Sequence, residues 1–512
     1  MDKLSSVGYN RNRKPRNKLT CGGSMADILI IGAGVAGLSA GIYARLSGHN
    51  VIVCEAHSIP GGNLTGWQRG EYHIDNCIHW LTGTNPHDPL YSMWLDLGAL
   101  GGGIRVHQGD MLFKYELNGE TLSVYRDLYR MRDEMLSLSP EDRDEILSLI
   151  RAVELVERLN NVGGENKNEG ISLGQLIKGV PALIKYYNLS CGELSERFKH
   201  PIIRKLIASI IGRDFGSLAL LMIIATFSSD NGGIPEGGSY AMAQRMAKRL
   251  TDLGGRLLTN KRAIKINTVG KRASSVSFAD GDTLSADYVI ATIDPAILFG
   301  ELTDIPMPKA LLKNYKNDKL FRFSSYHCAF ACDTDEPPFE GDVLFPVPIK
   351  YYSRLKTDHI TLREFSHEPT YAPEGKTVLG TMTYLAEEDC LELIKLRQTD
   401  REAYNAKKRE LAEITEDCII RHYPELEGRI HLLDTWTPAS YKRFTYSEMG
   451  AFMSFALPER KLPIPTTNRV KGAENLILAT QWQRIPGGLP TAATFGKIAI
   501  ETINKLEKKE SK

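Results

Sequence analysis

Three glycines at a fixed spacing, Gly32, Gly34 and Gly37, carry the clearest chemical signal in this sequence. In a strand-to-helix turn, the first glycine makes the tight bend, the second lets the backbone approach a pyrophosphate, and the third permits close packing of the helix on the strand. Val35 and Ala36 would add N–H groups and the partial positive charge of a helix N-terminus. The sequence therefore predicts a dinucleotide phosphate site at this turn.

A carboxylate follows this turn at the expected distance. Glu55 lies about 20 residues beyond Gly34, which is where an acidic side chain accepts hydrogen bonds from ribose hydroxyls. A negative charge there disfavours a 2′-phosphate. The spacing predicts that Glu55 binds the ribose, but it leaves NAD and FAD as alternatives.

The elements that must position these residues are readable from the same stretch. The apolar, β-branched run Ile28 to Ile31 predicts a buried strand, Leu38 to Leu46 predicts a helix that ends at Gly48, and Val51 to Cys54 predicts a second strand. Strand, helix and strand in this order make a βαβ unit, which predicts an α/β fold with a parallel sheet.

Several segments farther along the chain resemble the flavin amine oxidase and phytoene desaturase superfamily. They are the glycine pair in the segment Ala56 to Asn63, the block Gly232 to Ser239 followed by a helix from about Tyr240 to Leu253 and a strand from Arg256 to Ile266, and the block Asn475 to Gly496 near the end. The last block is similar to the C-terminal flavin motif of carotenoid isomerase-like and desaturase-like oxidoreductases. The resemblance implies FAD as the cofactor.

The resemblance also implies which residues bind FAD. It implies contacts to the flavin's phosphates or ribityl chain from Ala56, Gly61, Gly62 and Asn63, a main-chain contact to the adenine from Ala263, and contacts near the isoalloxazine from Gln481, Leu489, Pro490 and Thr491. Proline suits a first helical turn, so Leu489 to Thr491 would begin the last helix, and its positive end would stabilise charge on the reduced flavin. Asn63 and Gln481 stand where many relatives have charged residues.

The chain is expected to be α/β, with a Rossmann-like FAD-binding domain built from discontinuous segments and an inserted α+β substrate domain with a helical lid. The predicted ranges are 26–100, 232–300 and 466–512 for the FAD-binding domain, 101–231 and 301–465 for the substrate domain, and 1–25 for a basic disordered tail. Within the substrate domain we expect a hairpin over 111–124 turning at Asn118-Gly119, strands near 321–332, 343–352 and 377–385, a helix over 400–422, and mostly helical segments over 139–159 and 171–227.

The resemblance implies flavin chemistry on a carbon-carbon bond of an apolar polyene or lipid-like substrate, by desaturation, saturation or double-bond isomerisation. The flavin carries the hydride, so few protein acids or bases are needed, and no catalytic residue or electron partner is assigned. Two alternatives stay open. One is amine oxidase-like C–N oxidation, in which Trp482 contributes to an aromatic cage, and the other is a noncatalytic flavin-binding protein.

The segment Ile202 to Ile211 is amphipathic, with Arg204 and Lys205 opposite its apolar residues. It predicts either the core-facing helix of a lid or a helix that lies on a membrane where a lipid enters. The protein would accordingly be cytoplasmic, with peripheral membrane contact as the second alternative. The nearly balanced charge, 63 Lys and Arg against 62 Asp and Glu, gives no reason to expect nucleic acid as a partner.

A dense polar cluster, made of His73, Asp75, Cys77, His79 and Trp80, fits no common zinc spacing, so we predict no metal and favour structural hydrogen bonding over a substrate contact. The eight cysteines contain no CxxC pair, and we expect reduced, mostly buried thiols.

Overall fold

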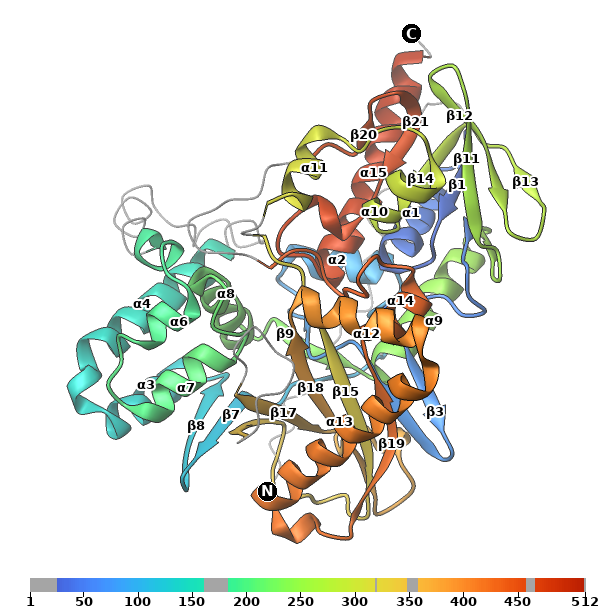
Figure 1. The fold of residues 1–512 in the computed structure, drawn as a ribbon. Coiled ribbons are helices and arrows are strands. Elements are labelled where there is room, and N and C mark those ends of the chain that lie inside the picture. The colour runs from blue at the N-terminus through green and yellow to red at the C-terminus, as the bar shows by residue number, and fades with distance from the viewer. Residues whose placement is uncertain (1–24, 161–182, 318–319, 348–357, 457–465, 511–512) are drawn as a thin grey trace.

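The computed structural model describes residues 25–160, 183–317, 320–347, 358–456 and 466–510 (Figure 1). The predicted basic tail lies outside this range except for Met25. Cys21, part of the predicted helical segment 171–227 and the end of the predicted strand 343–352 also lie outside it.

The first sheet has six strands in the order β10-β2-β1-β14-β21-β20, and they come from both ends and the middle of the chain. The strands are β1 (Asp27–Ile31), β2 (Asn50–Cys54), β10 (Arg256–Leu258), β14 (Tyr288–Ala291), β20 (Arg469–Val470) and β21 (Ala473–Leu478). All neighbours are parallel except β20 and β21. Helix α1 (Val35–Leu46) joins β1 to β2, so the predicted βαβ unit is confirmed.

Helices and a small sheet cover the two faces of the first sheet. On one face α1 packs with α9 (Gly238–Asp252) and α15 (Leu489–Glu510). On the other face lie β11 (Ala263–Val269), β12 (Arg272–Phe278), β13 (Thr283–Leu284), α10 (Pro295–Ile297) and α11 (Lys309–Tyr315). The fold is therefore α/β, as predicted.

The strand predicted for residues 256–266 is wrong in one respect, because the chain breaks there into β10 and β11, which belong to different sheets. Asn260 adopts the left-handed conformation with φ 53°, which turns the chain. The next N–H, from Lys261, donates to the Glu55 carbonyl at 2.7 Å instead of continuing β10.

The second sheet has seven strands in the order β19-β15-β18-β17-β16-β7-β8. The strands are β7 (Met111–Leu117), β8 (Glu120–Tyr125), β15 (Ser324–Cys332), β16 (Asp342–Pro346), β17 (His359–Glu364), β18 (Thr377–Leu385) and β19 (Ile430–Trp436). The predicted hairpin is confirmed, since Asn118 and Gly119 both have positive φ, as a type I′ turn requires. The sequence analysis missed β17 and β19.

Three helices accompany the second sheet, namely α12 (Glu387–Thr399), α13 (Arg401–His422) and α14 (Pro438–Thr445). Side chains alternate across β15, so Cys328 and Cys332 face the α13 side, where Leu411, Cys418 and Ile419 pack. Ser325, His327 and Ala329 point to the opposite side. The seven cysteines within the described residues are free, and six of them are buried.

A helical layer lies beside the β7–β8 edge (Figure 1). It contains α3 (Leu128–Leu138), α4 (Arg143–Asn160), α6 (Cys191–Ser195), α7 (Pro201–Ser209) and α8 (Ser217–Ser228). In and just after α7, the apolar residues Ile202, Ile203, Leu206, Ile207, Ile210 and Ile211 are all buried in one core. The amphipathic segment is therefore core-facing. No helix within the described ranges is long and apolar enough to cross a membrane.

Smaller elements connect these parts. They are α2 (Pro89–Asp96), the pair β3 (Gly66–Arg69) and β4 (Tyr72–Asp75), and a sheet of β5 (Leu81–Thr82), β9 (Gly232–Pro235) and β6 (Val106–His107). The boundary predicted after residue 100 divides this last sheet, because β6 falls in a range predicted for the substrate domain, whereas β5 and β9 fall in ranges predicted for the FAD-binding domain.

Candidate functional site

The glycine turn forms a cradle at the start of α1. Gly34 is the N-cap and no side chain caps the helix, so the first helical N–H groups, from Val35, Ala36 and Gly37, keep their donor capacity. Gly61 donates its N–H to the Ala33 carbonyl at 2.9 Å and bridges Gly34. The two glycine segments singled out from the sequence therefore lie against each other.

Glu55 closes one side of this cradle. Its buried carboxylate accepts from the Ala33 N–H at 2.8 Å through Oε2 and from the His57 N–H at 3.0 Å through Oε1. Each oxygen has a further lone pair, which fits the predicted ribose contact. The main chain of Glu55 also pairs with Leu258 and Lys261, and this brings Ala263, at the start of β11, to the same region. Ala56 is half-buried beside it.

Asn63 and Gln481, far apart in sequence, meet at one carbonyl oxygen. The Asn63 Nδ2 and the Gln481 Nε2 each lie 3.3 Å from the Phe452 O, to which they donate. The Asn63 Oδ1 is buried and has no partner among the described residues, so it can accept a hydrogen bond from a bound group. The sequence analysis missed Phe452, whose surroundings carry no motif.

The start of the last helix completes the cradle, and the prediction that Leu489, Pro490 and Thr491 begin it is confirmed. The Gly488 N–H donates to the Gln481 Oε1 at 2.8 Å, so Gln481 holds the turn before the helix. Ser39 of α1 donates to the Ala493 carbonyl at 2.7 Å. The N-terminal turns of α1 and α15 are therefore packed together.

We expect the substitution Gly34→Ala to weaken FAD binding without unfolding the protein. Gly34 has φ −69°, and an added Cβ would lie no closer than 3.9 Å to the nearest protein atom, Gly61 O. The methyl group would instead occupy the space that a pyrophosphate needs. Titration of the apo-protein should show an FAD dissociation constant raised at least about 10-fold, which corresponds to about 1.4 kcal/mol. An unchanged constant, or a lower melting temperature without FAD, would contradict this.

Within the polar cluster predicted around residues 73–80, Asp75 makes structural hydrogen bonds. Asp75 accepts from the N–H and the hydroxyl of Ser239, both at 2.6 Å, and from the Tyr371 hydroxyl at 3.0 Å, which ties β4 to the start of α9. Burial lowers the pKa of His73 and of His79. Within the described ranges, no group of three or more His, Cys, Asp or Glu side chains is arranged to hold a metal ion.

An aromatic path runs from the helical layer to the cradle. Phe215 packs edge-on against Phe323, at 5.2 Å between ring centroids, and Phe323 packs edge-on against Phe452 at 5.4 Å. Phe321 and Tyr384 join the same cluster. Trp482 is likewise buried, between Tyr315 and Phe455, so it packs in a core and forms no open aromatic cage.

A buried histidine lies between the cradle and the second sheet. His327 is 6 % exposed, and burial lowers its pKa to about 3. Below about pH 6.5 the unfolded chain binds a proton at His327, whereas the folded chain does not. The free energy of unfolding is therefore unaffected by His327 above pH 6.5 and decreases as the pH falls from 6.5 toward 3.

We expect His327 to make the apo-protein about 2 kcal/mol less stable at pH 5 than at pH 7, through its own titration. Urea unfolding at the two pH values measures the difference, and His327→Gln should reduce it by about that amount. A variant with the same pH dependence as the wild type would show that His327 is protonated in the folded state.

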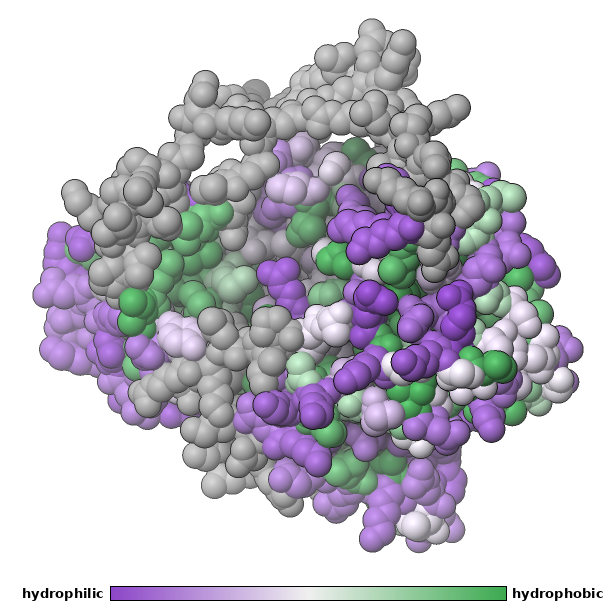
Figure 2. Space-filling view, turned by 90° about the horizontal axis from the view of Figure 1, so that it is seen from above, coloured by the Kyte–Doolittle hydropathy of each residue, from purple (hydrophilic) through white to green (hydrophobic). Residues whose placement is uncertain are grey.

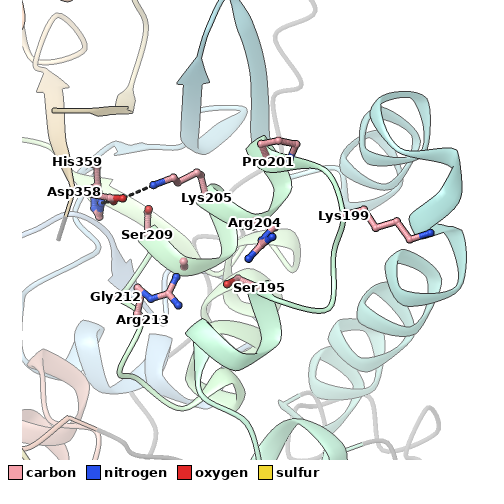
Figure 3. A pocket seen from close by; sticks show the side chains of 11 residues that line it. Ser195, Lys199, Pro201, Arg204, Lys205, Ser209, Gly212, Arg213, Asp358 and His359 are labelled. Atoms are coloured by element: carbon pink, nitrogen blue, oxygen red, sulfur yellow. Dashed lines mark hydrogen bonds and ion pairs between the residues drawn. The ribbon is translucent and has the colours of Figure 1, made fainter. Parts of the chain in front are cut away.

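A cavity of about 300 Å³ lies in the helical layer, away from the cradle (Figure 3). Its walls contain Lys199, Arg204, Lys205 and Arg213. Lys205 is paired with Asp358, and Arg213 lies 3.1 Å from Glu196. Arg204, Arg213 and Ser195 line this cavity together (Figure 3). The cavity therefore presents positive charge.

Comparison with protein families gives one match that covers most of the chain. The family described as "Flavin containing amine oxidoreductase" matches residues 35–503. The chain belongs to this family. It is an FAD-dependent oxidoreductase of the flavin amine oxidase superfamily, so the resemblance seen in the sequence is confirmed, and so is FAD as the cofactor.

Similar proteins of this superfamily span most of the chain. A chloroplastic prolycopene isomerase from Daucus carota is 25% identical over 467 residues, which are 86% of this chain and 74% of that protein. A 4,4'-diaponeurosporene oxygenase from Staphylococcus aureus is 22% identical over 95% of this chain and 99% of its own length. A lycopene-forming phytoene desaturase from a Paracoccus species is 24% identical over 52% of this chain and 54% of its own length.

Solved structures share the fold at lower identity. An oxidoreductase from Methanosarcina mazei superposes with a TM-score of 0.60 at 19% identity and covers 93% of this chain and all of its own. Cyclohexylamine oxidase from Brevibacterium oxydans has a TM-score of 0.58 at 14% identity and covers 95% of this chain and all of its own.

The residues present fit FAD. The uncapped start of α1, the acceptor capacity of Glu55 and the buried, unpartnered Asn63 Oδ1 provide donors and acceptors for a bound dinucleotide. The individual cofactor contacts of the residues named from the sequence stay predictions, although the structure brings those residues into one cradle.

Proposed function

We propose that this FAD-dependent oxidoreductase acts on a carbon-carbon bond of a long apolar polyene, by desaturation, saturation or double-bond isomerisation. The aromatic core from Phe215 through Phe323 to the half-buried Phe452 carries the proposal, because it makes the surroundings of the carbonyl at which Asn63 and Gln481 meet apolar. Aromatic rings attract an extended apolar chain without offering it a charge. The printed names of the relatives, prolycopene isomerase and phytoene desaturase, support the same substrate class.

We further propose that the first sheet with α1, α9 and α15 forms a Rossmann-like FAD-binding domain, and that the second sheet and the helical layer form the substrate domain with its lid. The proposed FAD-binding domain consists of the predicted segments 26–100, 232–300 and 466–512. The proposed substrate domain consists of the predicted segments 101–231 and 301–465. Support comes from the first sheet, whose strands all fall within the three segments assigned to FAD.

In this arrangement the starts of α1 and α15 hold the cofactor's negative groups, Glu55 orients the ribose, and Asn63 accepts one hydrogen bond. The bound FAD supplies hydride transfer. The chain's own residues exclude water around the apolar substrate and keep it aligned, which is where most of the protein's contribution to the rate would lie.

The test is incubation of the FAD-loaded protein with cis-configured polyenes of different saturation, followed by chromatography and mass spectrometry. Desaturation or saturation changes the mass by two hydrogen atoms, whereas isomerisation changes retention at constant mass. The expected result is one of these products, absent when the apo-protein is used without FAD.

Other products would replace this proposal. Hydrogen peroxide and an aldehyde from an amine substrate would establish C–N oxidation, and a bound flavin that dithionite cannot reduce would indicate a noncatalytic role.

We also propose peripheral contact with an anionic membrane surface, since a long polyene is dissolved in lipid. The cavity with Arg204 and Arg213 offers charge to lipid headgroups. Helix α8 leaves Met222 37 % exposed and Leu218 and Ile223 half-buried, and Figure 2 shows apolar side chains over this part of the molecule.

Sedimentation with vesicles tests this contact. Binding to the vesicles should require anionic lipid. The affinity should fall at least about 10-fold in the double variant Arg204→Glu, Arg213→Glu, because each cation near the surface contributes about 1 kcal/mol. The matched control is Lys313→Glu, which changes an exposed charge on α11. Equal binding to neutral vesicles would contradict the proposal, and loss of binding in inorganic phosphate alone at constant ionic strength would assign the cavity to free anions.

A further inference from the structure

Tyr446, at the end of α14, adopts a backbone conformation that residues other than glycine rarely occupy. Its φ is 55° and its ψ is 14°, in the left-handed region. Its N–H donates to the Lys442 carbonyl at 2.9 Å, so the helix ends at this residue. A side chain persists in this region only where its surroundings fix it, and such residues are frequent at ligand clamps. The groups that hold Tyr446 are therefore informative about its role.

The ring of Tyr446 contacts groups that border the adenosine end of the predicted FAD site. It lies 5.5 Å from the ring of His57, with 20° between the two planes, and the Arg262 guanidinium lies over it at 4.6 Å. The His57 N–H donates to the Glu55 carboxylate, and Arg262 directly precedes Ala263. Glu55 and Ala263 are the residues predicted to bind the ribose and the adenine. The Tyr446 ring therefore joins the two segments that are expected to hold the adenosine.

The main chain after Tyr446 is fastened to the first sheet. The Ser447 hydroxyl and the Glu448 N–H donate to the Asp294 Oδ2, at 3.0 Å and 3.1 Å. Asp294 is buried shortly after β14, at the carboxyl end of a strand that pairs with β1. Ligands of open α/β sheets bind at the carboxyl ends of the strands. The end of α14 is therefore fixed beside the nucleotide site, although the chain reaches it from β19 of the second sheet.

The side chains that Tyr446 holds keep binding capacity of their own. The His57 Nε2 is buried and has no hydrogen-bond partner among the described residues. The His57 ring also packs 5.2 Å from the ring of Phe444, so it is held from a second direction. An imidazole nitrogen in a fixed ring can bond a hydroxyl or a ring nitrogen of a ligand. The cluster therefore offers an ordered wall with one unused polar atom beside the predicted adenosine position.

We propose that Tyr446 closes the adenosine end of the FAD site as a positioning residue. Its ring holds His57 and Arg262 in place before the cofactor arrives, so less side-chain freedom is lost when FAD binds. Since Tyr446 belongs to the segment 301–465, the cofactor site includes a part of the proposed substrate domain. The proposal rests on FAD as the cofactor and is independent of the substrate.

The test removes the ring of Tyr446 without straining the backbone. Glycine accepts a φ of 55°, so Tyr446→Gly should keep the turn, while Tyr446→Phe keeps the ring. The apo-proteins are titrated with FAD and with ADP, which is the adenosine half of the cofactor. Tyr446→Gly should raise both dissociation constants by the same factor of about 10. Tyr446→Phe should bind both ligands as the wild type does.

The matched control is Asn118→Gly in the β7–β8 hairpin. It also replaces a left-handed residue, with φ 53°, by glycine, and its affinity for FAD should be unchanged. FMN, which has no adenosine, should bind the wild type and Tyr446→Gly alike. An unchanged FAD affinity in Tyr446→Gly overturns the proposal. A loss that FMN shares, or a loss for FAD that ADP does not share, also overturns it, because either result places the effect outside the adenosine end.

Discussion

Replacing Gly37 with alanine is expected to abolish FAD binding and to destabilise the first βαβ unit. A Cβ at this position would lie 1.9 Å from the Gly32 carbonyl oxygen and 3.2 Å from the Thr292 hydroxyl oxygen. The oxygen is part of the turn itself, in which Gly32 has φ 99°, so the turn has to open or α1 has to leave the sheet. We expect a loss of about 3 kcal/mol or more in the free energy of unfolding.

The measurement is the ratio of FAD to protein after purification, together with urea unfolding of the apo-protein. A matched control is Gly48→Ala at the other end of α1, where φ is 89° and no atom lies within 4 Å of the added Cβ. The Gly48→Ala variant should lose about 1 kcal/mol in the free energy of unfolding, because alanine is strained in the left-handed conformation, and it should still bind FAD. A Gly37→Ala protein that purifies with a full complement of FAD would show that the turn does not hold the cofactor.

The second large effect is expected when the buried ion pair of Arg363 with Asp342 is broken. Arg363 donates two hydrogen bonds to Asp342 and one each to the carbonyls of Ile78 and His79, so it fastens the second sheet to the segment after β4. Burial alone would raise the pKa of Asp342, but the neighbouring guanidinium lowers it to about 2. Arg363→Met leaves the buried Asp342 carboxylate with only the His79 ring, 3.7 Å away, as a side-chain partner and should cost about 3 kcal/mol.

A double-mutant cycle separates the ion pair from the burial of its atoms. Asp342→Leu alone should cost a similar amount, because it strands the guanidinium. The double variant should lose less than the sum of the two, since apolar side chains of similar volume fill the site without an unpaired charge. Urea unfolding of the four proteins gives the coupling energy. If the free-energy losses of the two single variants add up to the loss of the double variant, the two charges do not interact and solvent reaches the pair.

The sequence predicts those parts of the molecule whose conformation depends on residues close together in the sequence. The turn from Gly32 to Gly37, the hairpin at Asn118 and the start of α15 each depend on a few consecutive residues with special backbone preferences. Glu55 belongs to the same group, because the spacing of a βαβ unit fixes its place. These residues could be found without knowing what packs on them.

The parts that the sequence did not predict depend on contacts between distant segments. Strands β17 and β19 interrupt their apolar residues with charged ones such as Arg363 and Asp434, and their partners come from elsewhere in the sheet. Phe452 reaches the site through Asn63, which lies 389 positions away in the sequence, and it stands in no motif.

The packing of α15 on α1 also has a consequence for biosynthesis. The hydrogen bond from Ser39 to Ala493 joins residues 454 positions apart, and β21 completes the sheet that β1 begins. The nucleotide pocket therefore cannot close while the chain is still being translated, and contacts of such long range slow folding. A ribosome that stops before the last helix releases a chain with half a pocket, which protein quality control can recognise. FAD binding thus requires a chain that has been made at least as far as α15.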